Sequence, residues 1–271
     1  KTKAEPQPDG TYKIYGTKIY ITYGDHNMTE NIIHLVLART PDAPEGTKGI
    51  SLFIVPKFFV NDDGSLGDRN DVKCIGLEDK LGIHASPTCV MSFGENDGAT
   101  GWLIGAKNKG MAAMFTMMNN ARLNVGIQGV GLAEQATQIA MSYAADRVQG
   151  RAPDAQRGEN TPVAIASHPD VRNMLMTMRA LTDAARAICY ENGVFHDLAH
   201  FADDDKAKAF NELLTPISKA FSTDIANEVS SLGVQIHGGM GFVEETGIAQ
   251  FVRDAKILPI YEGTNGIQAI D

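Results

Sequence analysis

The sequence predicts an α+β multidomain protein, in which a middle β-barrel or sandwich domain is followed by a C-terminal up-and-down helical bundle. Short stretches rich in β-branched and aromatic residues fill the chain up to about residue 104 and are bounded by Gly, Pro and Asp. Beyond residue 105, long runs rich in Ala, Met and Leu repeat their apolar residues at helical spacing. We therefore predict a partial β-domain over residues 1–105 and a helical domain over residues 106–271.

Three segments carry the β prediction most clearly. They cover residues 17–22, 32–38 and 50–55, and Ile, Val, Leu, Tyr and Phe dominate each of them. Turn-forming residues separate the segments, as is typical of a small barrel or sandwich built from consecutive strands.

The helical domain is predicted to contain three long helices. The first runs from Met111 to Arg147, and the second opens at 168–170 and reaches about Leu198. The third follows the acidic turn 203–205 and ends at about His237. Carboxylates at a helix N-terminus complement the helix dipole, so this turn is interpreted as a solvated cap and no metal site is predicted.

The charge balance and the cysteines bear on the class of partner. Lys and Arg number 24 against 33 Asp and Glu, and the net charge of −9 disfavours nucleic acid and anionic membranes as partners. No apolar run approaches the ~20 residues that a membrane span requires, so no membrane association is predicted. The three cysteines match no metal or disulfide spacing and are interpreted as buried thiols in a reducing compartment.

The first predicted helix has two features that could serve function or packing. Met111, Met114, Phe115 and Met118 share one apolar face, which either lines a hydrocarbon channel or packs in the core. Farther along the helix come three glycines, Gly126, Gly129 and Gly131. They lack the strand that precedes a dinucleotide fingerprint, so we interpret them as sites of close helix packing.

The segment 251–264 places a carboxylate, Glu262, at the end of an apolar run and just before a helix start. Thr264 is a good N-cap for a closing helix over 265–270, so the backbone of Glu262 lies near unpaired N–H groups. Those groups could bind a substrate oxygen, whereas the plainer interpretation is that Glu262 only complements the helix dipole. Upstream, Gly238 and Gly239 lack side chains and would let a large ligand, such as a flavin, approach the backbone.

The order and spacing of several motifs resemble the acyl-CoA dehydrogenases over nearly the whole chain. The matching motifs lie at 18–22, 119–122, 143–147, 235–239, 253–256 and 261–264. Segments 24–31 and 80–88 look like a larger bacterial branch that includes 3-methylmercaptopropionyl-CoA dehydrogenase. In this family an N-terminal helical domain and further β-strands precede the segment matched here, so we expect the chain to be a fragment.

The resemblance implies a role for Glu262 as the catalytic base. It would abstract the α-proton of an acyl-CoA thioester while a hydride passes to N5 of FAD, giving a trans-2-enoyl-CoA. Met118, Tyr261 and Gly263 would line the substrate pocket, and Arg122 and Arg253 would organise the site. Some members carry the base immediately before the arginine that matches Arg122, but this chain has an alanine there.

The resemblance also implies an FAD site and a set of partners. The flavin-binding residues would be Tyr20, Thr22, Arg147, Gln235, Gly238, Gly239 and Thr264. Arg147 would meet the diphosphate of a neighbouring subunit's flavin, so a homodimer or homotetramer is expected. An electron-transfer flavoprotein would accept the electrons in the bacterial cytoplasm.

Two alternatives to this function remain open at the level of sequence. An acyl-CoA oxidase would use the same base and differ in the access of oxygen to the flavin. A catalytically silent helical interaction module would use the helices alone. A fragment without the rest of the flavin pocket is also expected to bind FAD weakly and to be inactive by itself.

Overall fold

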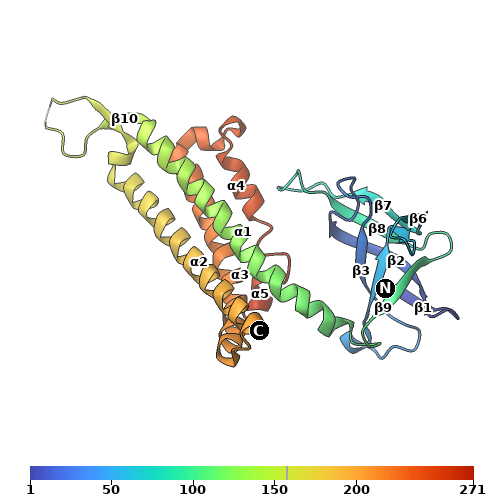
Figure 1. The fold of residues 1–271 in the computed structure, drawn as a ribbon. Helices are drawn as coiled ribbons and strands as arrows, with labels where there is room; N and C mark the ends of the chain where they lie inside the picture. Colours follow the sequence, from blue (N-terminus) through green and yellow to red (C-terminus); the bar gives the residue numbers. More distant parts are fainter. Residues whose placement is uncertain (157) are drawn as a thin grey trace. The chain divides into compact units, whose positions relative to one another are not determined.

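The computed structural model describes residues 1–156 and 158–271, which form two compact units, Lys1–Met117 and Met118–Asp271. The first unit is built on an antiparallel sheet and the second on long helices (Figure 1). The predicted α+β fold class is therefore confirmed. The first helix starts at Gly110, five residues after the predicted end of the β-domain. It then crosses the boundary between the units.

The first unit contains nine strands. They are β1 (Lys3–Pro6), β2 (Tyr12–Thr22), β3 (Ile33–Ala38), β4 (Ser51–Pro56), β5 (Phe58–Val60), β6 (Leu66–Arg69), β7 (Val72–Leu77), β8 (Thr88–Phe93) and β9 (Ala99–Ile104). Seven of them form one sheet in the order β3-β4-β9-β2-β8-β7, with β1 added beside β2, while β5 and β6 pair separately. All the pairs between these strands are antiparallel.

Strand β2 connects the two halves of the sheet. Its first part pairs with β1 and β9, and its second part, from Gly16 onward, pairs with β8. Gly16 has a φ of 141°, and a Cβ on it would lie 3.0 Å from Cα of Thr2, so the change of partners requires glycine. The strand is longer than the predicted 17–22 because this bend continues the strand instead of ending it.

The interior of the first unit is apolar and closely packed. Ile14, Phe53 and Val55 are fully buried there, and Tyr12 packs its ring 4.9 Å from the ring of Phe53. Cys89 is buried in this core while Cys74 is half-buried, and burial raises the pKa of the Cys74 thiol. The prediction of buried thiols is therefore confirmed for Cys89, and also for Cys189 of the second unit, and it is wrong for Cys74.

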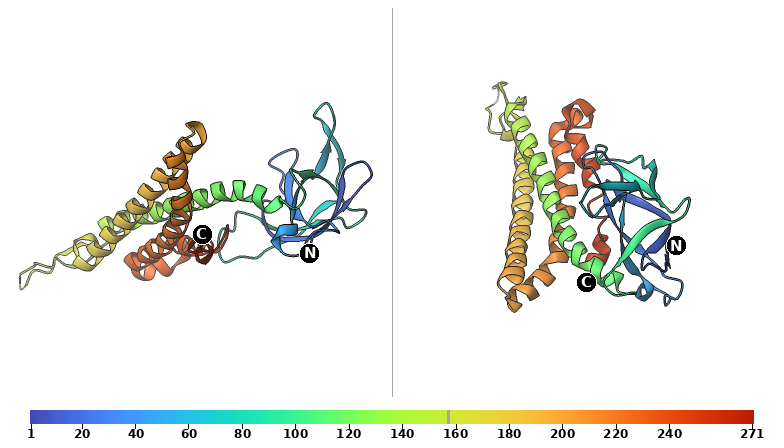
Figure 2. Two further views of the ribbon diagram at one scale, coloured as in Figure 1. Left: turned by 90° about the horizontal axis from the view of Figure 1, so that it is seen from below. Right: turned by 45° about the vertical axis from the view of Figure 1, so that its right-hand side comes forward.

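The described residues of the second unit form five α-helices and one short hairpin, besides short 3-10 turns. They are α1 (Gly110–Asp146), which begins in the first unit, β10 (Val148–Arg151), β11 (Pro162–Ala164), α2 (Pro169–Phe201), α3 (Asp205–His237), α4 (Ile248–Ala255) and α5 (Asn265–Gln268). Helices α1, α2 and α3 run side by side in the views of Figures 1 and 2. Pro169 stands in the first turn of α2, and Asp204 caps α3 by accepting from the N–H groups of Lys206 and Ala207, as predicted.

The three long helices pack through small residues. Ala133, Ala136, Ala140 and Ala144 of α1 are fully buried in a core shared with α2, α3 and α4. A Cβ on Gly129 would lie 2.6 Å from the carbonyl oxygen of Ser222 on α3. The prediction of close packing is confirmed for Gly129, and also for Gly126, whose Cβ would lie 2.9 Å from Ser218 O. It is wrong for Gly131, which faces open space.

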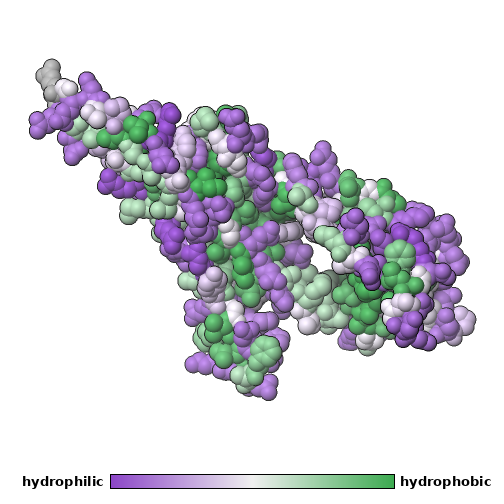
Figure 3. All heavy atoms as spheres, turned by 45° about the horizontal axis from the view of Figure 1, so that its top comes forward, coloured by the Kyte–Doolittle hydropathy of each residue, from purple (hydrophilic) through white to green (hydrophobic). Residues whose placement is uncertain are grey.

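The visible surface mixes apolar and polar residues (Figure 3). On the first unit, three apolar side chains form a row across neighbouring strands: Leu35 pairs with Ile54, and Ile54 pairs with Trp102. They are 50%, 37% and 41% exposed. Across residues 1–156 and 158–271, every helix is too short or too polar to cross a lipid bilayer.

Candidate functional site

Glu262 lies on a tight turn between α4 and α5. Its φ is 54° and that of Gly263 is 83°, so two consecutive residues adopt the left-handed conformation. Glycine accepts this conformation freely, but for a glutamate it costs about 1–2 kcal/mol and must be held by its surroundings. Thr264 follows as the N-cap of α5 and accepts a hydrogen bond from Ile267 N–H, as predicted.

The residue before Glu262 anchors the turn to the helical core. Tyr261 packs against a buried cluster that includes Leu258 of the preceding segment and Val125 of α1. Its hydroxyl donates a hydrogen bond to Oε1 of Gln128, also on α1. Burial raises the pKa of Tyr261, and the charge of Glu262 raises it further. The phenol is therefore neutral, and the turn carries an apolar wall on the side of Tyr261.

Arg122 reaches the same turn from α1. Its side chain is nearly buried and forms an ion pair of 2.7 Å with Asp271. A Cβ on Gly263 would lie 3.6 Å from a terminal nitrogen of Arg122, so the guanidinium borders the turn at Gly263. The structure thus places the positive charge of Arg122 next to the residue that follows Glu262.

Lys219 holds the turn from a different helix, α3. It is fully buried, and its Nζ donates to the carbonyl oxygen of Gly263 at 2.7 Å and to Oδ1 of Asn265 at 2.9 Å. The amide of Asn265 in turn donates to Asp224 Oδ1 at 2.8 Å. Burial lowers the pKa of Lys219 to about 8, since desolvation penalises its charged form, and nearby Arg122 adds to the effect.

A hollow in the second unit is lined by three of the predicted flavin ligands, Arg147, Gly238 and Gly239. The hollow has a volume of about 490 Å³ and lies where α1 and α3 end. The further lining residues are Tyr143, Gln149, Ile165, Ile236, His237, Met240 and Val243. Gln235 lies in the last turn of α3 and does not line the hollow.

The glycines in and next to this hollow are required for different reasons. Gly238 has a φ of 59°, and Gly241 needs to be small because a Cβ would lie 2.3 Å from Val234 O. Gly239 has neither constraint, and a Cβ on it would meet nothing within 4 Å. Neither φ nor packing therefore explains the glycine at 239, which lines the hollow, and this fits the close approach of a ligand to the backbone.

Aromatic stacking forms the base of the hollow. Tyr143 stacks on His237 with 4.1 Å between ring centroids, and its hydroxyl lies 3.4 Å from His237 O. His237 is nearly buried, and its Nδ1 lies 2.7 Å from the carbonyl oxygen of Gly233. The exposed guanidinium of Arg147 thus stands at a rigid, flat surface suited to a planar group and its phosphates.

Tyr20 and Thr22 belong to strand β2 of the first unit. Tyr20 is 70% exposed and has a φ of 61°, within an irregularity of the pairing between Lys18 and Ile21. A non-glycine residue in this conformation is uncommon, and such outliers concentrate at functional sites. Thr22 is likewise exposed at the end of the strand.

Two other predicted residues have contacts away from Glu262. Arg253 of α4 forms a bidentate ion pair with Glu244 at 2.7 and 2.8 Å, and not with the turn. Met118 is half-buried on α1, near the start of the second unit.

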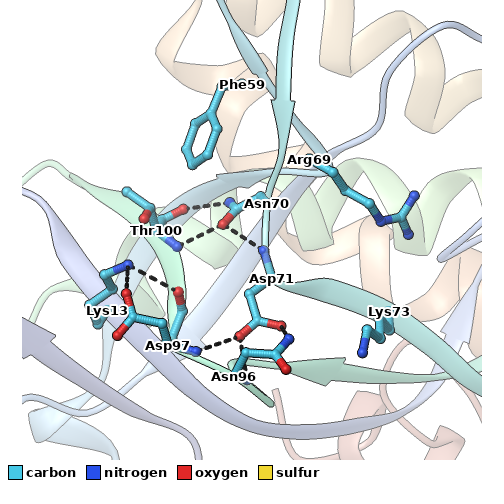
Figure 4. A pocket seen from close by; sticks show the side chains of 10 residues that line it. Lys13, Phe59, Arg69, Asn70, Asp71, Lys73, Asn96, Asp97 and Thr100 are labelled. Carbon is cyan, nitrogen blue, oxygen red and sulfur yellow. Dashed lines mark hydrogen bonds and ion pairs between the residues drawn. The ribbon is translucent and has the colours of Figure 1, made fainter.

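The first unit has its own hollow, which the sequence does not indicate (Figure 4). Asn70 at its centre is buried, donates to the carbonyl oxygens of Pro56 and Thr100, and accepts from Thr100 N–H. Asp71 accepts from Asn96 and Asp97, and although burial raises its pKa, these hydrogen bonds lower it below the usual value. The polar groups at the centre of this hollow, Asn70, Asp71 and Asn96, are thus held by hydrogen bonds within it, which indicates a structural role.

Lys219, Asn265 and Gln128 belong to the site although the sequence did not predict them there. A signal for Lys219 was present, because it falls at helical spacing among small residues of one buried face of α3. Its partners lie more than 40 residues downstream, however, and only the folded chain brings them together.

The chain is similar to known proteins over its whole length. A family model, "Acyl-CoA dehydrogenase, C-terminal domain", matches residues 108–271. The 3-methylmercaptopropionyl-CoA dehydrogenase of Ruegeria pomeroyi is 55% identical over 99% of this chain and 45% of its own length. The chain thus spans about half the length of this curated relative.

Solved structures show the same fold. The structure of Caenorhabditis elegans ACDH-11 in complex with C11-CoA has a TM-score of 0.84 and 25% sequence identity to this chain. The match covers all of this chain and 42% of the ACDH-11 chain. A structure described as an electron transferring flavoprotein of Acidaminococcus fermentans matches all of this chain and 62% of its own, with a TM-score of 0.78 and 27% identity. Because the family model covers more than half of the residues, this chain belongs to the acyl-CoA dehydrogenase family.

Proposed function

We propose that this chain is the part of an FAD-dependent acyl-CoA dehydrogenase that carries the catalytic base, Glu262. The observation that supports this most is the strained turn: Glu262 adopts a left-handed conformation between an apolar cluster and the N-terminus of α5. A solvated glutamate that only complements a helix dipole needs no such conformation. The proposed reaction is the α,β-dehydrogenation of an acyl-CoA thioester to a trans-2-enoyl-CoA.

The proposed mechanism begins with a proton transfer. The Glu262 carboxylate accepts the α-proton, which is weakly acidic until its thioester oxygen is stabilised. Within residues 1–156 and 158–271, no hydrogen bond uses the backbone N–H of Glu262, so this group is free to donate to the thioester oxygen. Tyr261 and the apolar cluster beneath it exclude water on one side of the carboxylate.

FAD, when bound, supplies the acceptor for the β-hydride. In this chain, Tyr20 and Thr22 would face the isoalloxazine ring of the FAD. Arg147 and the backbone at Gly238 and Gly239 would hold the diphosphate and the adenosine half of the FAD of a neighbouring subunit. Gly239 supports this assignment, because it lines the hollow and neither a positive φ nor a close neighbour requires glycine there. Gln235, Thr264, Arg253, Met118 and Gly263 keep their predicted roles as part of the proposal.

The substrate and partners are proposed from the relatives. One relative is named for 3-methylmercaptopropionyl-CoA and a solved structure holds C11-CoA, which supports an acyl-CoA thioester here. An electron-transfer flavoprotein is the proposed electron acceptor, supported by the similar structure described under that name. A homodimer or homotetramer in the bacterial cytoplasm completes the proposal.

Anaerobic stopped-flow spectroscopy of the FAD-loaded protein that contains this chain tests the proposal. Mixing with a short acyl-CoA should bleach the flavin absorbance in the parent protein. We expect Glu262→Gln to slow bleaching by about 10²–10⁴-fold, the typical contribution of a general base. Glu245→Gln changes an exposed carboxylate nearby and should leave the rate unaltered.

Each alternative function has its own outcome in this experiment. Unchanged bleaching in Glu262→Gln would refute Glu262 as the base. Absence of bleaching in the loaded parent protein would favour a silent interaction module. Steady peroxide production in air during turnover would favour an acyl-CoA oxidase.

A further inference from the structure

Lys219 is the only lysine among the fully buried side chains of the described residues, and it lies in the middle of α3. Burial of an ammonium group is costly, and the lowered pKa of Lys219 shows that cost here. A methionine would fill nearly the same volume with no charge to desolvate. Filling the core therefore does not explain a lysine at this position.

The contacts of Lys219 converge on the turn that carries Glu262. The ammonium donates to Gly263 O at 2.7 Å, and Gln268 Nε2 donates to the same oxygen at 3.1 Å. Gly263 is the residue directly after Glu262, and its carbonyl belongs to the Gly263–Thr264 peptide, so these donors fix the backbone one residue beyond the left-handed glutamate. A second contact, to Asn265 Oδ1 at 2.9 Å, holds the start of α5.

Asn265 extends this clamp back to α3. Its amide nitrogen donates to Asp224 Oδ1 at 2.8 Å, to Thr223 Oγ1 at 3.0 Å and to Ala220 O at 3.2 Å. The amide group is thereby held on both sides, with its oxygen on Lys219 and its nitrogen on the next turn of the helix. Such over-determination is what a strained backbone conformation requires in order to persist.

We propose that Lys219 is a positioning residue for Glu262, which acts by clamping the Gly263 carbonyl and Asn265 so that the carboxylate and the Glu262 N–H keep their reactive orientation. This inference rests on the proposed function, because it concerns the same proton transfer. The charge of the ammonium matters to the clamp because a charge-assisted hydrogen bond is roughly twice as strong as a neutral one.

The test compares Lys219→Met with the parent as FAD-loaded protein containing this chain. We expect the limiting rate of flavin bleaching per bound flavin to fall by about 10–100-fold, since small misplacements of a reacting group cost up to about 100-fold. The substrate concentration for half-maximal rate should change less than about threefold, since Lys219 is buried away from solvent and binds no substrate in the proposal. A merely structural lysine would lower stability and flavin content without lowering the rate per bound flavin.

Met178→Ala is the matched control for loss of stability. Met178 is fully buried in the same helical core, and its truncation costs about 2–5 kcal/mol. It makes no contact with the Glu262 turn in the described contacts of the core, so the rate per bound flavin should equal that of the parent.

Asn265→Ala provides a second variant that keeps the proposal testable if Lys219→Met fails to fold. Alone it should also slow bleaching by about 10-fold or more, because it removes the other half of the clamp. In the double variant the losses should be less than additive, since both residues act on one turn.

Two results would overturn the inference. One is a rate per bound flavin that stays close to that of the parent in both Lys219→Met and Asn265→Ala. The other is fully additive losses in the double variant. Because Glu262→Gln separately reports on the base, a slow Glu262→Gln with fast clamp variants refutes only the role of Lys219.

Discussion

Glu262 combines an unfavourable backbone conformation with the most reactive role proposed for this chain. Its φ of 54° lies in the left-handed region, where a Cβ approaches the following carbonyl oxygen. The Tyr261 side chain before it and the contacts of Lys219 with Gly263 O and Asn265 after it hold the turn. At the scale of the residue, the turn is held by its neighbours and not by the preference of glutamate.

This conformation predicts the effect of Glu262→Gly on stability. Glycine removes the left-handed penalty of about 1–2 kcal/mol. It also makes the unfolded chain more flexible, and this lowers stability by about 0.5–1 kcal/mol. We expect the FAD-free variant to be as stable as the parent or more stable by up to about 1.5 kcal/mol in urea denaturation. Glu245→Gly, without a positive φ, should instead lose stability. A lower midpoint for Glu262→Gly than for Glu245→Gly would contradict this.

Lys219 predicts a rise of stability with pH. Its pKa is about 8 in the folded chain against 10.5 for an ordinary lysine, so between these values the unfolded chain binds the extra proton. Stability therefore rises with pH through this window, by about 3 kcal/mol for a shift of this size. Urea denaturation of the parent and of Lys219→Met from about pH 7 to about pH 11 isolates the effect. The difference between their unfolding free energies should grow in favour of the parent, and a flat difference would refute the assignment.

Sequence and structure agree on the local features of the site and differ on the distant ones. Glu262 and the Thr264 cap were predictable because both depend on residues within a few positions of each other. Lys219 and Gln128 were not, because their contacts with the turn depend on how α1 and α3 pack. Arg253 was assigned to the site from its motif, yet its ion-pair partner is Glu244.

At the scale of elements, α1 relies on two glycines for its contact with α3. Gly129→Ala would place a Cβ 2.6 Å from Ser222 O, which is backbone and cannot move alone. We expect a loss of about 1–3 kcal/mol in thermal or chemical unfolding, as for other overpacked cores. Gly131→Ala on the same helix meets nothing within 4 Å, and it should raise stability by about 0.5–1 kcal/mol. Equal stabilities of the two variants would contradict the packing assigned to Gly129.

The predicted helix boundaries were most accurate where a proline or an N-cap residue marks the start of the helix. The start of α2 at Pro169 and that of α3 beyond Asp204 agree with the prediction because proline and aspartate act locally. The closing helix ends at Gln268, two residues short of the predicted Ile270. The short strands β5 and β6 lack a long apolar alternation and were not predicted individually.

At the scale of the whole molecule, the apolar row on the first unit is a contiguous group of exposed apolar side chains. Leu35, Ile54 and Trp102 are each more than a third exposed, and Trp102 is the sole tryptophan of the sequence. Exposed contiguous apolar residues favour association and dye binding. We expect acrylamide to quench the Trp102 fluorescence of the 271-residue chain strongly and Leu35→Thr to weaken binding of a hydrophobic dye. Fluorescence that resists the quencher would show that the row is covered.

The two units also differ in how far sequence can describe them. The helical unit was assigned from periodicity, whereas the order of strands in the sheet was not predicted. Strand order depends on which distant segments pair, and β2 pairs with β9 at one end and β8 at the other. The fold class therefore followed from sequence, while the topology required the folded chain.

Helix α3 has a consequence for how this chain can vary in length. Lys219 holds the Glu262 turn from the middle of α3, and the helix ends at His237, where Gly238 opens the second hollow. At a rise of about 1.5 Å per residue, the helix sets a distance of about 27 Å between Lys219 and His237. Inserting or deleting one residue within it would turn one end by about 100° against the other, so homologous chains should tolerate length changes in loops but not in this helix.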